Sequence, residues 1–231
     1  MNKYLGSAEK ALKLAQQGYE TISAYKNFLE SQNITSIDCF ENLPITDKQN
    51  YILKYSLKDL MPQNIKKGYR IGRSSGSSSS SGKISYWLQS PEKIKNDALR
   101  LRMFLESNFQ IHQKPSLAIM ALGFGNWVAS ENFNLALNTV SIGINYTFYT
   151  CCTGPNLESI IDIINNINSE VEQIIIFIVP SLIFHLQERA KYLGYDLPVH
   201  KLRYIVTGES FPENFRINLQ NQAQVSPEKP F

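Results

Sequence analysis

Apolar and polar residues alternate with two different periods along this chain, and the first period is helical. Over the first thirty residues apolar side chains recur at three- and four-residue steps, which is typical of an amphipathic helix. Gly18 weakens this pattern and Lys26 interrupts it. The stripe consists of Leu5, Ala8, Leu12, Ala15, Tyr19, Ile22 and Leu29. We therefore expect one long helix that lies on the body of the protein.

Two further features precede residue 91. Thr46 or Asp47 is a candidate helix cap, and the pattern that follows predicts a helix over Tyr51–Leu60. A serine tract then separates Tyr69–Arg73 from Ile84–Gln89, where apolar and polar residues alternate. Because alternation of this kind indicates a strand, we expect the tract to join two extended segments rather than a strand and a helix.

From Pro91 onward, short apolar runs alternate with helical patterns. We expect strands at Leu117–Leu122, Ile144–Tyr149, Ile174–Val179 and Leu202–Val206. We expect helices to begin near Pro91, Asn126, Asn156 or Leu157, Pro180 and Pro212. Alternating units of this length predict an α/β fold in which a largely parallel sheet is flanked by helices.

Composition then narrows the class of protein. The 231 residues are 43% hydrophobic, which is enough for a buried core. The net charge is only +3 and the basic residues are scattered, so no nucleic-acid partner is expected. The longest apolar run, Ile174–Phe184, is much shorter than the ~20 residues of a membrane span. The N-terminus has no secretory pattern. Cys39, Cys151 and Cys152 predict no disulfide framework, which fits a reducing, cytoplasmic compartment.

The tract Arg73–Lys83 is the most informative stretch. Backbone N–H groups near Gly76 and Gly82, serine hydroxyls and the lysine would together suit a polyphosphate. A flexible serine-rich linker is the simplest alternative. A Walker-type loop does not fit, because five residues rather than four separate the glycines and Ile84 follows the lysine. The residues of the tract therefore leave a linker and a phosphate loop open.

The tract resembles the phosphate loop Ser-Ser-Gly-Thr-Thr-Gly-Lys-Pro of adenylate-forming enzymes, with three extra serines and Ile84 in place of proline. Other segments resemble the phenylacetate–CoA ligase-like branch of that superfamily. In chain order they are Leu43–Lys48, Tyr86-Trp87, Gly123–Trp127, and Thr207-Gly208-Glu209 with Pro212 and Arg216. The resemblance extends from about residue 40 to about residue 220.

The resemblance implies an AMP-forming ligase. In such an enzyme a small carboxylic acid attacks the α-phosphate of ATP with Mg²⁺, giving an acyl-adenylate and pyrophosphate, and the thiol of coenzyme A then takes the acyl group and releases AMP. The implied phosphate-binding residues are Ser74, Ser75, Gly76, Ser77, Ser78, Gly82 and Lys83. Those implied beside the adenine are Gly208, Glu209 and Ser210, and those implied in the acyl pocket are Phe124 and Trp127. Each of these assignments has a simpler interpretation. Residues 123–125 would form an ordinary turn, Trp127 would belong to the core, and Glu209 would be an acidic residue near the N-terminus of a helix.

Several motifs of the superfamily do not occur in these 231 residues. They are a Tyr-Gly-x-x-Glu segment, a ribose-binding aspartate and a C-terminal domain with a catalytic lysine. We therefore expect an incomplete adenylation domain over 1–221, an irregular tail over 222–231, catalytic residues downstream of Phe231, and no ligase turnover by the chain alone. No metal ligand is assigned.

Two other functions stay open at this point. One is an acyl-protein synthetase, which shares the fold and the adenylation step. The other is a non-catalytic nucleotide- or partner-binding remnant whose exposed sheet edge recruits another chain. A homodimer is also left open. The aromatic content near 124–149 suits either an aryl or an alkyl acid.

Overall fold

The computed structural model of the chain describes residues 5–63, 68–74, 84–123, 125 and 127–222. The chain divides into two compact units, Met1–Ser90 and Pro91–Phe231. The first unit contains one cluster of buried hydrophobic residues, and the second contains two such clusters. Each unit therefore has a core of its own.

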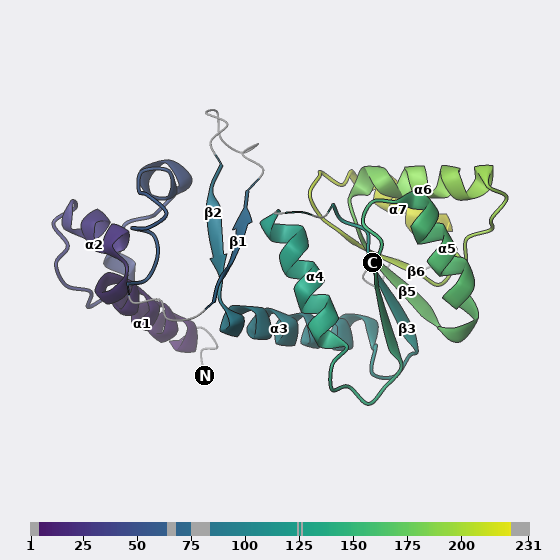
Figure 1. The fold of residues 1–231 in the computed structure, drawn as a ribbon, viewed down its shortest axis with the longest axis horizontal. Helices are drawn as coiled ribbons and strands as arrows, with labels where there is room; N and C mark the ends of the chain where they lie inside the picture. The colour runs from purple at the N-terminus through teal and green to yellow at the C-terminus, as the bar shows by residue number, and fades with distance from the viewer. Residues whose placement is uncertain (1–4, 64–67, 75–83, 124, 126, 223–231) are drawn as a thin grey trace. The chain divides into compact units, whose positions relative to one another are not determined.

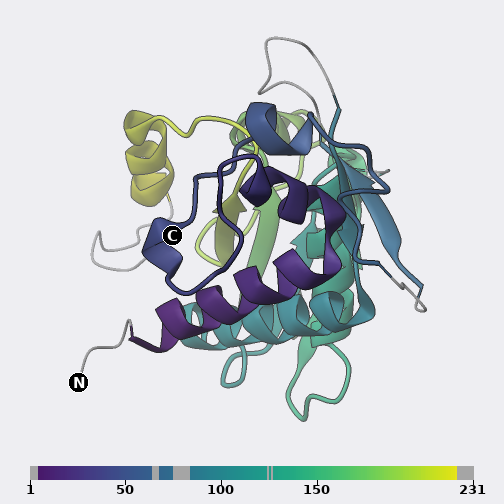
Figure 2. The ribbon, with the colours of Figure 1, turned by 90° about the vertical axis from the view of Figure 1, so that its left-hand side faces the viewer.

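The first unit begins with α1 (Leu5–Thr21) and α2 (Ser23–Glu30), which Figure 2 shows as separate helices. The expectation of one continuous helix was wrong. Ile22 is extended (φ −118°, ψ 107°) and forms a β-bridge with Pro62. The carbonyl of Asp59 accepts a hydrogen bond of 3.0 Å from the second residue of α2. Pairing with these later residues requires extended backbone at Ile22, so tertiary contact overrides the helical pattern.

Asp47, one of the two residues expected as a helix cap, caps the short helix η2 (Lys48–Ile52). Its carboxylate accepts hydrogen bonds of 2.7 Å from the backbone N–H groups of Gln49 and Asn50. The Asn50 side chain accepts a hydrogen bond from the Asp47 backbone in return, which completes a capping box. The expected helix over Tyr51–Leu60 was wrong, because turns follow η2 in this region.

Aromatic rings form much of the core of the first unit. The ring of Tyr51 lies 6.1 Å from that of Tyr25 and 5.6 Å from those of Phe28 and Tyr55, between ring centroids. Phe28 is fully buried beside Leu29. Burial raises the pKa of the Tyr51 phenol from 10.0 to about 12.

We expect the first unit to lose stability as the pH rises from 10 to 12. The pKa of Tyr51 is higher in the folded chain than in the unfolded chain. The contribution of this residue to the free energy of unfolding is therefore complete below pH 10 and is lost as the pH passes about 12. Circular dichroism at increasing pH, with tyrosinate absorbance recorded in parallel, measures the effect. The variant Tyr51→Phe cannot ionise and should lose less stability in this window. Identical profiles for the two proteins would contradict the prediction.

The serine tract does connect two extended segments. The strands β1 (Arg70–Arg73) and β2 (Tyr86–Gln89) form an antiparallel pair. The Ser74 N–H donates to the Ser85 carbonyl at 2.8 Å, and the Ser85 N–H donates to Ser74 Oγ at 3.0 Å, so the pairing continues one step beyond the strands. Residues 75–83 lie outside the described residues.

The second unit is built on a parallel sheet in the order β4-β3-β5-β6. Its strands are β3 (Ser116–Met120), β4 (Phe148–Cys152), β5 (Gln173–Ile178) and β6 (Leu202–Val206). β3 and β5 are buried along their whole length, as expected for a parallel sheet covered on both faces. The predicted α/β fold class is confirmed.

One of the four expected strands is displaced. β4 begins at Phe148 rather than at Ile144. The residues before it pack against a helix instead, where the hydroxyl of Tyr146 donates a hydrogen bond of 2.9 Å to the carboxylate of Glu106. The guanidinium of Arg102 lies 5.9 Å from the centroid of the Tyr146 ring. These contacts hold residues 144–146 outside the sheet.

Helices cover both faces of this sheet (Figure 1). One face packs against α5 (Leu157–Ile167), α6 (Pro180–Tyr192) and α7 (Glu213–Gln222), and the other against α3 (Pro91–Phe109) and α4 (Val128–Val140). The side chain of Asn156 caps α5 by accepting a hydrogen bond of 2.9 Å from Ser159 N. In the part of the chain that the structure describes, no helix has the length and hydropathy needed to cross a membrane.

Candidate functional site

The order in which successive strands are added to the sheet reverses at β3. The chain passes from β3 to β4 on one side and then crosses over β3 to form β5 on the other side. In open α/β sheets, ligands bind beyond the carboxyl ends of the strands at such a switch point. The strands are parallel, so the segments that follow β3, β5 and β6 all leave the sheet at this edge.

A cavity of about 500 Å³ opens near this edge, between α3, α4 and the sheet. Both helices present side chains at steps of three, four and seven residues. From α4 the lining residues are Ala129, Asn132, Phe133 and Ala136. From α3 they are Asp97, Arg100, Leu101 and Phe104. Since most of these side chains are apolar and the volume is that of a small-molecule pocket, the cavity is the leading candidate binding site.

The sheet contributes Phe177 and Ile205, the penultimate residues of β5 and β6. The ring of Phe177 is buried and lies 5.9 Å from that of Phe133, between centroids. The floor of the cavity is therefore fixed by the core of the unit, whereas Ala129 on α4 is exposed. A ligand would meet a rigid apolar surface on the sheet side.

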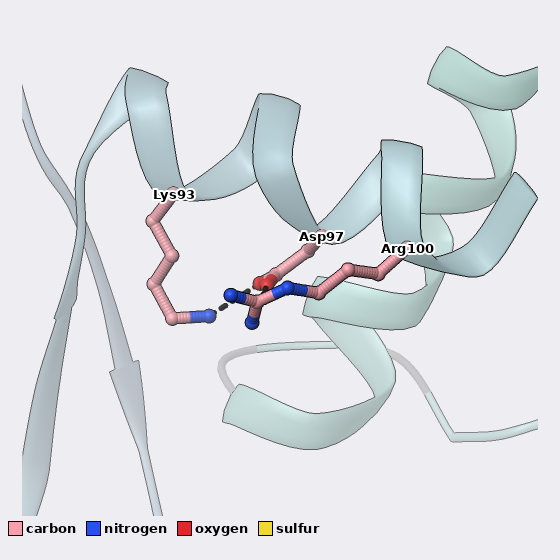
Figure 3. Close-up of polar contacts among 3 residues, drawn as sticks. All are labelled: Lys93, Asp97 and Arg100. Atoms are coloured by element: carbon pink, nitrogen blue, oxygen red, sulfur yellow. Dashed lines mark hydrogen bonds and ion pairs between the residues drawn. The ribbon is translucent and has the colours of Figure 1, made fainter. Parts of the chain in front are cut away.

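Two charged side chains of α3, Asp97 and Arg100, line the cavity, and Figure 3 shows them together with Lys93, which lies one turn earlier on the same helix. The carboxylate of Asp97 accepts a hydrogen bond from the ammonium group of Lys93 and lies 4.0 Å from Nη1 of Arg100. The Arg100 side chain is 80% exposed, so this ion pair contributes little to stability. Two cations around one carboxylate leave this set of side chains net positive, which favours an anionic group on a ligand.

The turn after β6 carries the residues expected beside adenine. Gly208 has φ +87°, and a side chain there would bring its Cβ within 3.3 Å of Val179 Cγ1. Glycine is therefore favoured by the backbone conformation, and a Cβ would in addition require Val179 to shift by a few tenths of an ångström. The carboxylate of Glu209 accepts hydrogen bonds from Ser181, the second residue of α6. Residues 208–210 are exposed.

The residues expected in the acyl pocket lie at the start of α4. Trp127 is the N-cap residue of this helix, and its carbonyl accepts a hydrogen bond of 3.1 Å from Glu131 N. Its side chain is 38% exposed and does not line the cavity, although Ala129, two residues further on, does. Phe124 lies outside the described residues. A pocket role for these two aromatic residues stays a prediction.

Of the expected phosphate-binding residues only Ser74 is described, at the end of β1. Ser75, Gly76, Ser77, Ser78, Gly82 and Lys83 lie outside the described residues. The hydrogen bonds between Ser74 and Ser85 hold the base of the hairpin, and they are compatible with either a linker or a phosphate loop. The phosphate role of the tract therefore stays a prediction.

The cysteines have no nucleophilic arrangement. Cys151 packs against the core beside α5 and α6, and burial raises the pKa of its thiol. The Cys152 thiol donates a hydrogen bond of 2.5 Å to Asn134 Oδ1, and burial raises its pKa as well. A raised pKa reduces the thiolate fraction near neutral pH. Among the described residues no three His, Cys, Asp or Glu side chains form a group suited to a metal ion.

The sequence analysis missed most of the cavity lining. Ala129, Asn132, Phe133 and Ala136 share one face of α4, and the helical period alone groups them. Asp97 and Arg100 follow from the same period on α3. By contrast, Phe177 and Ile205 could not be placed in the cavity before the order of the strands was known.

The second unit has an α/β architecture in which helices flank a parallel four-stranded sheet. Among solved structures, the chain is similar to an open conformation of 2-hydroxyisobutyryl-CoA ligase in complex with 2-HIB-AMP and CoA. The TM-score is 0.69 at 11% sequence identity, which shows the fold alone. The match covers 95% of this chain and 51% of that chain, so the chain spans about half of that ligase.

No protein-family profile matches the chain, and no curated protein matches it either. The similarity in structure concerns the fold, and membership of the adenylate-forming superfamily stays a prediction. It does not distinguish the phenylacetate–CoA ligase-like branch within it, which stays a prediction.

Proposed function

We propose that this chain supplies substrate-binding elements of an adenylate-forming acid–thiol ligase. In this proposal the cavity holds the acyl group of a small carboxylic acid, and the turn Thr207–Ser210 lies beside the adenine of ATP. The serine tract contacts the β- and γ-phosphates. The observation that carries the proposal is the apolar cavity at the carboxyl ends of β5 and β6.

The distance between the two proposed subsites supports this reading. Ile205 lines the cavity, and Gly208 follows it by three residues. Three residues span roughly 10 Å at most, which is within the length of an acyl-adenylate. An acid and a nucleotide held at these places would have the carboxylate and the α-phosphate between them, and such positioning is the main demand of the reaction.

The reaction also requires groups that the chain does not itself supply. Coenzyme A would be the acceptor thiol, and Mg²⁺ would accompany ATP. The described residues offer no cluster of His, Cys, Asp or Glu side chains for a metal ion. Cys39, Cys151 and Cys152 are free thiols, as expected for a reducing compartment, and we place the protein in the cytoplasm as part of the proposal.

Calorimetric titration of the full chain with 5′-O-sulfamoyladenosine and with its N-phenylacetyl and N-hexanoyl derivatives tests the proposal. We expect at least one acyl derivative to bind tenfold or more tightly than the parent. An acyl group that buries ~100 Å² of apolar surface contributes ~2.5 kcal/mol. The guanosine counterparts serve as controls for the base. Absence of binding, or equal affinity with and without an acyl group, would contradict the proposal.

A further inference from the structure

Helix α6 begins without a cap of its own. Its N-cap residue is Val179, which makes no side-chain capping bond, and its first turn contains no acidic residue. The first backbone N–H groups of a helix need partners from elsewhere. Glu209, which lies 28 residues further along the chain than Ser181, provides one such partner: Oε2 accepts from Ser181 N at 3.1 Å, and Oε1 also accepts from the Ser181 hydroxyl at 3.0 Å.

The same turn is attached to the β5–α6 connection at two other points. The Thr207 N–H donates to the Ile178 carbonyl at 3.2 Å. Gly208 packs so closely on Val179 that a Cβ would lie 3.3 Å from its Cγ1. Residues 207–209 are thus fixed one after another against residues 178–181. The Glu209 carboxylate is the last of these attachments and the only one made by a side chain of the turn among the described residues.

We propose that Glu209 is a positioning residue for the nucleotide, acting through Ser181. This inference rests on the proposed function. Its carboxylate is committed to α6, so the turn presents its main-chain groups, rather than this side chain, to the base. The bidentate contact with Ser181 sets the place and direction of those groups.

Electrostatics favours this arrangement. An unattached carboxylate next to a nucleotide would repel the phosphates. At the N-terminus of α6 the partial positive charge of the helix compensates the carboxylate. The contact therefore orders the turn and at the same time offsets a charge that would oppose binding.

The test uses the full chain and four variants: Glu209→Ala, Glu209→Gln, Ser181→Ala and the double variant Glu209→Ala/Ser181→Ala. Affinities for ATP and GTP are measured by displacement of a trinitrophenyl-ATP probe. We expect Glu209→Ala to weaken ATP binding about fivefold and to reduce the ratio of ATP to GTP affinity, since a displaced turn no longer reads the base. Glu209→Gln keeps an acceptor for Ser181 N and should restore most of this ratio. Glu213→Ala, which changes an exposed acid of α7 paired with Arg216, is the matched control.

The double variant distinguishes an indirect from a direct role. If Glu209 acts through Ser181, the double variant weakens ATP binding no more than Glu209→Ala alone. We expect Ser181→Ala alone to weaken ATP binding less than Glu209→Ala does, because Ser181 N still donates to Glu209. If Ser181→Ala alone leaves ATP binding unchanged, or if the double variant loses the sum of the two separate losses, Glu209 acts independently of Ser181 and the inference is overturned. Unchanged ATP binding in Glu209→Ala would overturn this inference alone, whereas absence of ATP binding by the unmodified chain would overturn the proposed function. Amide hydrogen exchange at Ser181, measured without nucleotide, should accelerate in Glu209→Ala; an unchanged rate would contradict the contact itself.

Discussion

Replacing Ile176 with alanine should lower the free energy of unfolding of the second unit by about 2–5 kcal/mol. Ile176 lies in the middle of β5, is fully buried, and belongs to the core between the sheet and the helices α5 and α6. The substitution removes apolar contacts and leaves a cavity that a central strand, paired on both edges, cannot close. Because small proteins are stable by roughly 5–15 kcal/mol, a large part of the stability is lost.

Urea denaturation followed by circular dichroism measures this effect. Ile142→Ala is the matched control, since Ile142 is 74% exposed in the turn after α4 and the same atoms are removed from solvent rather than from a core. The control should change the free energy of unfolding by no more than about 0.5 kcal/mol. Equal losses for the two variants would show that Ile176 is not buried as described.

Ala129→Phe should abolish the preference for acyl-bearing ligands, which is the largest functional effect that we expect. Ala129 lines the cavity and is exposed within it, so a phenyl ring can occupy this space without displacing the core. If the cavity holds the acyl group, the N-acyl derivatives of sulfamoyladenosine should bind no better than the parent compound. The affinity for the parent should change little, because the turn at Gly208 is untouched.

Asn138→Phe provides the control for this experiment. Asn138 is an exposed residue of the same helix, outside the cavity lining, and its amide donates to Asn134 Oδ1. The Asn138→Phe substitution introduces the same ring on another face of α4 and should leave the acyl preference intact. Retention of the acyl preference in Ala129→Phe would place the acyl group elsewhere, and thermal melts of both variants establish that each is folded.

Much of the second unit follows from the sequence, because its elements are determined locally. The strand at Leu202–Val206 has the predicted bounds, and Asn156 caps α5 as its position before a helical pattern suggests. An unbroken apolar run such as 174–178 indicates a strand buried on both faces. Alternation of such runs with helical patterns is sufficient to predict the parallel sheet.

The errors arise where distant residues compete with local preference. Ile22 continues the helical stripe, yet Pro62 pairs with it and holds it extended. The run from Ile144 has the composition of a strand, but Tyr146 is held by Glu106 of α3. No period in the sequence encodes either pairing.

The candidate site shows the same limit. The motif at Thr207–Glu209 locates a turn, but the partner of its carboxylate, Ser181, lies on another helix. Likewise, the positions of Phe177 and Ile205 in one cavity depend on the adjacency of β5 and β6. The motifs therefore indicate which segments matter, and the topology determines which side chains share a site.

The complete burial of β5 has a consequence for the chain before it folds. Gln173–Ile178 contains neither charge nor proline, so in a nascent or denatured chain it is a segment able to form intermolecular cross-β structure. Glu170 and Glu172 precede it and Pro180 follows it, in the places where gatekeeper residues oppose such association. Parallel sheets form slowly because their pairings are distant in sequence, which prolongs this exposure. The flanking residues thus restrain, during biosynthesis, the aggregation of a strand that the native fold buries completely.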